Sequence, residues 1–265
     1  MKKKVLVLVK AEPAPSSKYG SSVCTAGITE EGEFIRLYPV PFQIFCDPAK
    51  RFNKYDWIEV ECERSDSDYR KESYKIKPET IRTVGHIGTD YNWQERNSII
   101  LPHVSKNIAE LKESNSSLGI IKPTEILDFY RDKKTNDAEI RNEFRQTFQL
   151  IFDEEGGMKK IPHIRPMDVH YSYIFKCDGD EKHDYICEDW ELYQSSRSWL
   201  DRYGTEDNVW DKIYEKYYDT FTKENDLHFF VGTHYRFKTW MIIGLYYPPK
   251  TGRYRQTTLF SKTRQ

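Results

Sequence analysis

Cysteines and long apolar stretches are both scarce in this chain. The cysteines are odd in number and widely spaced: Cys24, Cys46, Cys62, Cys177 and Cys187. Such a set suits a reducing compartment better than a disulfide framework. No run approaches the ~18 apolar residues of a membrane-spanning helix, and the apolar stretch at 5–9 is shorter than the roughly 7 to 15 residues of a secretory signal. We therefore expect a cytoplasmic protein with no membrane partner.

Motifs for nucleotide hydrolysis and serine catalysis are also missing. The chain has no GxxxxGK sequence, and Gly85 and Gly88 do not form the three-glycine fingerprint of dinucleotide-binding folds. The GxSxG motif of serine hydrolases is absent as well. Cys24 lies in an expected strand, where a role in the core is favoured over a catalytic one. The sequence thus gives no support to a P-loop enzyme or a serine hydrolase.

Aromatic residues are abundant and compensate for a polar composition. The chain has 265 residues, of which 31% are charged and 15% aromatic, and its mean hydropathy is -0.79. The aromatic side chains supply large apolar areas, so we expect a globular protein rather than a disordered one. The formal net charge of -1 hides a basic end, because residues 248–265 contain five basic residues and no acidic one. Since an anion responds to the local field, near-neutrality does not exclude anion binding.

The first ninety residues read as a series of short strands. Apolar or alternating patterns predict strands at 4–10, 23–29, 33–38, 57–64 and 80–86, with a hairpin turn at 29–32. Several short strands in one segment predict a small β-barrel or a curved sheet. A loop rich in proline, serine and glycine is expected at 11–22.

Helical spacing appears in the remainder of the chain. We expect helices at 105–114, with Ser105 as N-cap, and at 137–152, 187–203 and 207–225, with Thr205 or Asp207 capping the last. Strands are expected at 170–176, 227–232 and 240–247. The fold class predicted is α+β, with the N-terminal β-rich module at 1–90, a helical connector at 91–136, a module of mixed helices and antiparallel sheet at 137–249, and a flexible basic tail at 250–265.

A basic segment with interleaved tyrosines is the first candidate site. Such a segment can neutralise phosphates and stack on exposed bases, although lysines that protect the edge of a barrel would look similar. A charge within the apolar strand at 33–38 must either face solvent or be paired when buried. The candidate nucleic-acid-binding residues are Lys18, Tyr19, Arg36, Arg70, Lys71, Tyr74, Lys75, Lys77 and Arg82.

A segment dense in metal-binding residue types follows at 177–187, and acidic residues continue to Glu191. Cys177, His183 and Cys187 could supply three of the four ligands that zinc prefers, with His170 or another cysteine as the fourth, but their spacing is loose. Alternatively, His183, Asp189 and Glu191 could form a catalytic group around another divalent metal. Two plainer explanations compete: a buried Cys187 in the core, and acidic residues that complement a helix dipole.

The tail sequence Gln-Thr-Thr-Leu-Phe, residues 256–260, resembles the QxxLF-type peptide by which many replication and repair proteins dock onto the DNA sliding clamp. The resemblance implies that Gln256 enters a polar pocket while Leu259 and Phe260 enter an apolar groove. It departs from longer peptides of this type, because Ser261 and Lys262 stand where a second aromatic residue can occur. A tail that folds back onto the domain is the alternative.

These features predict a DNA-associated protein that binds nucleic acid through its β-rich module and is tethered to the sliding clamp by its tail. Tethering raises local concentration, so a weak intrinsic affinity would suffice. A metal-dependent nuclease or phosphodiesterase that uses His183, Asp189 and Glu191 is the alternative. A module that contacts a partner other than the clamp is a third.

Overall fold

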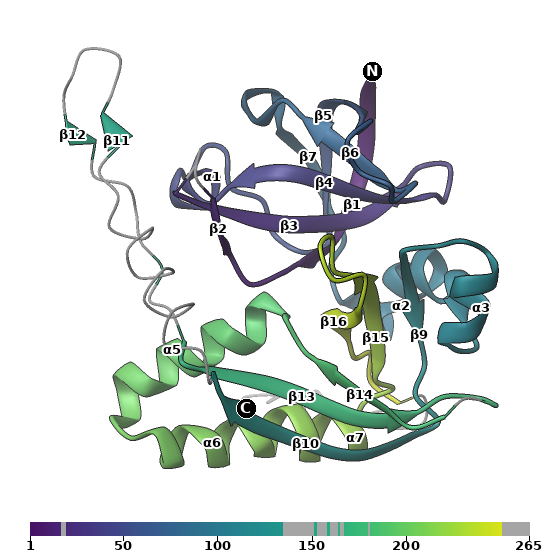
Figure 1. Ribbon diagram of the computed structural model, residues 1–265, viewed down its shortest axis with the longest axis vertical. Helices are drawn as coiled ribbons and strands as arrows, with labels where there is room; N and C mark the ends of the chain where they lie inside the picture. Colours follow the sequence, from purple (N-terminus) through teal and green to yellow (C-terminus); the bar gives the residue numbers. More distant parts are fainter. Residues whose placement is uncertain are drawn as a thin grey trace, which may run out of the picture.

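The computed structural model describes residues 1–16, 20–134, 151–152, 158–159, 164, 167–179 and 181–250 (Figure 1). The chain is an α+β protein, as its sequence predicts, with a closed β-barrel at the N-terminus and helices with antiparallel sheets after it. No helix in the described ranges is both long enough and apolar enough to span a membrane.

The barrel closes through five strands: β1 (Lys2–Lys10), β3 (Gly20–Thr29), β4 (Phe34–Pro41), β5 (Asp56–Arg64) and β6 (Ser73–Ile76). Around the barrel their order is β1, β3, β4, β6, β5 and back to β1. The pair β4–β6 is parallel and the other four pairs are antiparallel. The predicted β-barrel and its hairpin at the turn before β4 are therefore confirmed.

Shorter elements surround the barrel. Strand β2 (Ala14–Ser16) pairs with β3, and β7 (Arg82–His86) pairs with β5. The helices α1 (Gln43–Cys46) and η1 (Pro78–Thr80) lie in the connections before β5 and β7.

The C-terminal part contains two sheets whose strand pairs are antiparallel, apart from one parallel pair at the edge of the first sheet. In the first, the strands are ordered β16 (Trp240–Tyr246), β15 (His228–Thr233), β9 (Leu118–Ile121) and β8 (Val104–Ser105). The second is ordered β10 (Glu125–Lys133), β13 (Val169–Lys176) and β14 (His183–Ile186). Figure 1 shows β15 and β16 between the barrel and the second sheet. A separate pair joins β11 (Ile151–Phe152) to β12 (Met158–Lys159).

Helices cover these sheets from several sides. The first group is α2 (Asp90–Ile100), η2 (Leu101–His103) and α3 (Ile108–Glu113). The second group, drawn along the second sheet in Figure 1, is α5 (Trp190–Tyr203), α6 (Glu206–Tyr214), a π-helical turn η3 (Glu215–Thr220) and α7 (Phe221–Lys223). Thr205 caps α6 by accepting a hydrogen bond from Asn208 N, which confirms one of the two caps predicted for it.

Two helix starts and the connector differ from the prediction. Ser105 belongs to β8, and α3 begins later because Asn107 is its N-cap and accepts a hydrogen bond from Glu110 N at 2.9 Å. The helix α5 begins at Trp190 instead of residue 187, since Asp189 caps it. The segment 91–136 contains helices but also contributes β8, β9 and β10 to the two sheets. The helix predicted at 137–152 lies outside the described residues, except for Ile151–Phe152, which form β11.

Alternation along β1 builds two separate cores. Val5 and Val7 point into the barrel, whereas Leu6 and Leu8 point outward and pack with Phe230 and other side chains of the first C-terminal sheet. The outer face of β1, β3 and β4 is therefore an interface between the barrel and the rest of the chain.

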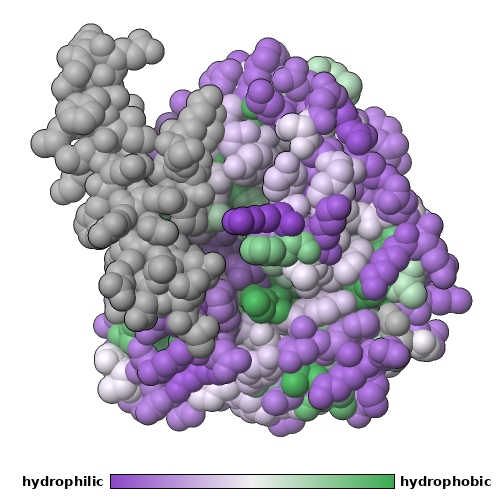
Figure 2. Space-filling view, viewed as in Figure 1, coloured by the Kyte–Doolittle hydropathy of each residue, from purple (hydrophilic) through white to green (hydrophobic). Residues whose placement is uncertain are grey.

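On the face shown in Figure 2, hydrophobic side chains appear only as small separate patches among hydrophilic ones, so this view offers no broad apolar docking surface.

Candidate nucleic-acid interface

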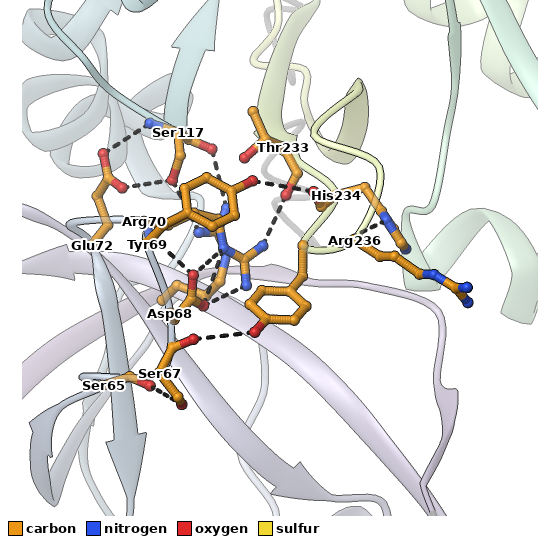
Figure 3. Close-up of polar contacts among 12 residues, drawn as sticks. Ser65, Ser67, Asp68, Tyr69, Arg70, Glu72, Ser117, Thr233, His234 and Arg236 are labelled. Carbon is orange, nitrogen blue, oxygen red and sulfur yellow. Dashed lines mark hydrogen bonds and ion pairs between the residues drawn. The ribbon is translucent and has the colours of Figure 1, made fainter.

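The loop between β5 and β6, residues 65–72, meets the turn between β15 and β16, residues 234–239 (Figure 3). Arg70 Nη1 donates to the Thr233 carbonyl oxygen at 2.9 Å. The Tyr69 hydroxyl donates to the His234 carbonyl oxygen at 3.4 Å, and the Tyr235 hydroxyl donates to the Ser67 carbonyl oxygen at 3.1 Å. Three hydrogen bonds thus join the barrel loop to the hairpin, one to the end of β15 and two to its turn.

Aromatic rings and cations gather on the exposed side of this contact. The rings of Tyr69 and Tyr235 stack with centroids 6.2 Å apart, and each residue is about half exposed, at 52% and 53%. Phe237 is 64% exposed and lies on the His234 ring at 4.8 Å. We call the surface formed by the following residues the junction surface: Tyr69, Arg70, Tyr235, Arg236, Phe237 and Lys238.

Each aromatic ring of the junction surface has a cation beside it. Lys238 Nζ lies 5.0 Å from the centroid of the Tyr69 ring, and the Arg70 guanidinium lies 5.4 Å from that of Tyr235. The Arg236 guanidinium lies 5.5 Å from the Phe237 ring. These distances are within the range of cation–π attraction.

The hairpin turn has a defined shape. His234 N donates to the Thr239 carbonyl oxygen at 2.8 Å, and the backbone N–H groups of Arg236 and Phe237 donate to His234 Nδ1. Lys238 has a φ of 56°, the left-handed conformation that a tight turn requires. Burial and the nearby Arg70 and Arg236 lower the pKa of His234, so the ring stays neutral and keeps Nδ1 as an acceptor.

Arg70 is paired with a carboxylate, whereas Arg236 and Lys238 are paired with none in the described part of the chain. Arg70 makes a forked contact with Asp68, with Nη2 to Oδ2 at 2.7 Å and Nε to Oδ1 at 2.9 Å. Burial alone would raise the pKa of Asp68, but the hydrogen bonds from Arg70 outweigh it and lower that pKa to about 2. Arg236 and Lys238 have no ion pair with another described residue, so their charge remains for an anionic ligand.

Arg36 does not belong to this exposed surface, which corrects its predicted role in nucleic-acid contact. Its side chain is buried, with the residue only 2% exposed, and donates to Ser117 Oγ at 3.2 Å and to the Ser117 carbonyl oxygen at 3.1 Å. Glu72 accepts from Ser117 N and Oγ at 3.0 and 2.6 Å. Burial lowers the pKa of Arg36, and the neighbouring Glu72 compensates in part. Through its hydrogen bonds to Ser117, Arg36 connects β4 to the segment before β9.

The other predicted nucleic-acid-binding residues fall into separate places. Lys71 and Tyr74 line a hollow at one end of the barrel. Three more of these residues are exposed on β6, after its end and on β7, away from the hollow. One of the three, Lys77, is paired with Glu61 at 2.8 Å. Lys18 and Tyr19 lie outside the described residues. Exposed but separate from the junction surface are Lys75, Lys77 and Arg82.

The predicted catalytic group is only partly assembled. Asp189 and Glu191 meet at the start of α5, but the cation between them is Lys54, with Nζ at 3.3 Å from Asp189 Oδ2 and 3.2 Å from Glu191 Oε2. His183 lies at the beginning of β14, with its ring 5.2 Å from those of Phe175 and Tyr185. The structure therefore does not bring His183 together with the two acids.

The predicted zinc ligands are also spread along the second sheet. Cys177 follows β13, His183 opens β14 and Cys187 follows it, and both cysteines are buried thiols. Burial raises the pKa of Cys187 well above its usual value, which disfavours the thiolate that zinc needs. Within the described ranges, no three His, Cys, Asp or Glu side chains form a group that could hold a metal ion. Binding of zinc or another divalent metal stays a prediction.

The peptide predicted to bind the sliding clamp, with Gln256, Leu259 and Phe260, lies outside the described residues. Its assignment rests on the sequence and stays a prediction.

Comparison with protein families divides the chain in two. Residues 1–102 match a domain of unknown function, DUF8758, and residues 103–264 match a second, DUF8757. The second match covers more than half of the chain. The chain belongs to the DUF8757 family. No curated protein matches it.

The DUF8757 match begins within η2, directly before β8. The junction surface therefore draws on both matched regions, with Tyr69 and Arg70 from the first and residues 235–238 from the DUF8757 region. This second half of the surface was not predicted, although the sequence His-Tyr-Arg-Phe-Lys at 234–238 carries a signal for it. Large rings and cations in a short hairpin turn have no core to enter, so they must face outward.

Proposed function

We propose that this protein binds nucleic acid with exposed bases, DNA in the first place, across the junction surface. The observation that carries the proposal is the half-exposed stack of Tyr69 and Tyr235 with cations beside both rings. Aromatic rings stack on bases of any sequence, and each such contact contributes about 1–3 kcal/mol by alanine substitution. Arg236 and Lys238 supply charge for phosphates, as single-strand-binding surfaces require.

The connectivity of the barrel adds support. Counted along the chain, the strands stand in the order first, second, third, fifth, fourth around the barrel, and α1 lies between the third and fourth. Barrels of the OB type, which are five-stranded Greek-key barrels, bind oligonucleotides on strands two and three and on the loops one–two and four–five. The likeness to OB-type barrels is one of fold, and the binding residues themselves are those of the junction surface.

The site differs from such a barrel in one respect. The outer face of β3 and β4 is packed against the first C-terminal sheet, and Arg36 is buried there. The four–five loop, residues 65–72, stays at the surface and carries Tyr69 and Arg70. We infer that the hairpin turn replaces the covered face as the second half of the binding surface.

The tail has a supporting role in this proposal. Its resemblance to sliding-clamp peptides suggests a tether that raises the local concentration of the protein at DNA. Because the tail is basic, it can also contribute nonspecific affinity of its own. Binding must therefore be measured with the full chain and with a chain that ends at residue 249.

Fluorescence anisotropy of a labelled single-stranded oligonucleotide tests the proposal. We expect salt-sensitive binding by both chains, and a roughly tenfold or larger loss of affinity in Tyr69→Ala/Tyr235→Ala, as removal of a stacking platform implies. The double variant Tyr69→Phe/Tyr235→Phe keeps the rings and loses the hydroxyl contacts between loop and turn, so it should bind almost as well as the parent.

The control is Tyr203→Ala, because Tyr203 is 40% exposed and has the Arg202 guanidinium 5.7 Å from its ring but lies on α5. Its affinity should not change. If the alanine variant at the junction binds as tightly as the parent while retaining its circular dichroism spectrum, the junction surface is not the binding site.

A further inference from the structure

A hollow opens at one end of the barrel, and its lining contains none of the six residues of the junction surface. Its volume is about 490 Å³, within the range of roughly 300–1,000 Å³ typical of small-molecule sites. Every barrel strand contributes a residue at or beside its end: Lys3 from β1, Thr29 from β3, Ile35 from β4, Arg64 from β5 and Tyr74 from β6. Mouths of β-barrels are among the preferred places for ligand sites.

The pleat of the strands explains why these side chains converge. Lys3 shares a face of β1 with Val5 and Val7, which lie in the barrel core, and Arg64 shares a face of β5 with Val60. Both cations therefore continue the inward-facing rows to the point where the core ends. A charge placed there lies at the rim of the barrel, where the strands no longer enclose it.

The cations of this mouth are not neutralised by carboxylates. The neighbours of Lys3 on the opposite face are paired, Lys2 with Glu59 at 2.6 Å and Lys4 with Glu30 at 2.8 Å. Lys3 and Arg64 have no ion pair with a described residue, and neither has Lys71, whose Nζ donates to the Ser114 carbonyl oxygen at 2.9 Å. Three cations of one hollow are thus available to an anion.

Acidic residues of the lining offset this charge only in part. Glu72 is buried and accepts two hydrogen bonds from Ser117, so its carboxylate is already engaged. Glu33 is exposed at the beginning of the hairpin and is the other acid of the lining. Lys3, Arg64 and Lys71 outnumber Glu33 and Glu72 by one, which leaves the lining with a formal charge of +1.

Aromatic surface lies beside the cations. Tyr74 is half-buried, and Lys3 Nζ lies 5.4 Å from the centroid of its ring. Phe34, also half-buried, lines the same hollow. A ligand with a flat ring and a phosphate could place its ring on Tyr74, where Lys3 now lies, and its phosphate against the ammonium group of Lys3.

We propose that the mouth of the barrel is a second binding site, which takes a nucleotide with its phosphate among Lys3, Arg64 and Lys71 and its base against Tyr74. The phosphate-bearing ligand can be a free mononucleotide or the 5′-phosphorylated end of a strand, because both present the same chemistry. The site shares no residue with the junction surface, although Lys71 follows Arg70 in the same loop.

Isothermal titration of the full chain with AMP, and with adenosine and inorganic phosphate as partial ligands, tests this site. AMP should bind more tightly than either part. Lys3→Gln and Arg64→Gln should each weaken AMP binding by about tenfold, a loss of ~1.4 kcal/mol. Lys2→Gln removes the same charge one residue away, but on the face paired with Glu59, and should leave AMP binding unchanged.

A second arm distinguishes the two sources of the phosphate. In the Tyr69→Ala/Tyr235→Ala background, a short oligonucleotide with a 5′-phosphate should bind more tightly than its 5′-hydroxyl twin if the ligand is the end of a strand. AMP binding with no such difference would assign the site to free nucleotides. If neither AMP nor the phosphorylated oligonucleotide binds, or if Lys3→Gln/Arg64→Gln binds them as the parent does, the proposal is wrong.

Discussion

Lys54 and Asp189 form a buried ion pair between the barrel and α5. Lys54 is 6% exposed and Asp189 1%, and Lys54 Nζ also donates to the Leu245 carbonyl oxygen at 3.1 Å. Asp189 accepts from Leu245 N at 3.0 Å as well as capping α5. Burial alone would lower the pKa of Lys54, but Asp189 and Glu191 outweigh it and raise that pKa well above its usual value. Burial raises the pKa of Asp189, and Lys54 and the backbone N–H groups of Leu192 and Leu245 oppose this shift. Every polar atom of the two side chains has a hydrogen-bond partner, which favours the charged pair.

Loss of the lysine should be costly because it leaves the buried Asp189 carboxylate without a positive charge beside it. We expect Lys54→Met to lower the free energy of unfolding by about 3–5 kcal/mol, measured by denaturant titration. The control Lys50→Met changes an exposed lysine of the same connection and should have little effect. Lys54→Met/Asp189→Asn removes the unpaired charge and should recover part of the loss. A Lys54→Met protein as stable as the parent would contradict this account.

At this scale the sequence could predict residue types but not their partners. The charge at Arg36 in an apolar strand predicted either exposure or pairing, and the structure shows pairing through Ser117, 81 residues away. Asp189 and Glu191 were identified as an acidic group, but Lys54 lies 135 residues before Asp189 and no local pattern connects them. Contacts of such separation depend on how the modules pack, which no spacing along the chain reveals.

Among the elements, β15 contains a buried histidine, His228, through which the stability of the fold depends on pH. His228 is 2% exposed, lies opposite Tyr246 of β16, and has Nδ1 2.9 Å from the Asp226 carbonyl oxygen. Asp226 Oδ2 lies 3.9 Å from Nε2, and Lys122 is paired with the same carboxylate at 2.7 Å. Burial lowers the pKa of His228, and the opposing effect of Asp226 does not compensate for it. The ring is therefore neutral in the folded protein.

This neutral ring makes stability depend on pH in a defined direction. The unfolded chain binds a proton at about pH 6.5, whereas the folded chain takes it up only at lower pH. The contribution of His228 is thus complete above about pH 6.5 and is lost as the pH falls through the folded-state pKa. Denaturant titrations across this window should show a smaller decrease in stability for His228→Gln than for the parent. An equal decrease in both proteins would refute the role of His228.

Strands were easier to predict than helix ends. Four strands of the barrel alternate or are continuously apolar because each has an inner face, whereas the short β6 was not predicted, and the strand predicted at 80–86 is β7. The strands β15 and β16 are apolar because the barrel and the second sheet cover them. Helix starts depend on which of several capping residues accepts a hydrogen bond from the first turn, and for α3 this is Asn107 instead of the predicted Ser105. The strands β9 and β10 were missed because their partners β15 and β13 come much later in the chain.

At the scale of the whole molecule, the candidate site exists only where two regions meet. The hydrogen bond from Tyr69 to His234 spans 165 residues, and that from Tyr235 to Ser67 spans 168. The sequence predicted a basic and aromatic surface on the β-rich module, and Arg70 is part of the surface that the structure assembles. The hairpin turn that completes it could not be placed beside the loop from the sequence, since their adjacency follows from packing of the first C-terminal sheet on the barrel.

Photo-crosslinking tests the position of the bound strand most directly. A single-stranded oligonucleotide carrying photoreactive thymine analogues is bound to the full chain, irradiated, and the linked peptides are identified by mass spectrometry. Our account predicts adducts at Tyr69, Tyr235 or Phe237, and their loss in Tyr69→Ala/Tyr235→Ala. Adducts confined to the outer face of β6 and β7, around Lys75, Lys77 and Arg82, would contradict it.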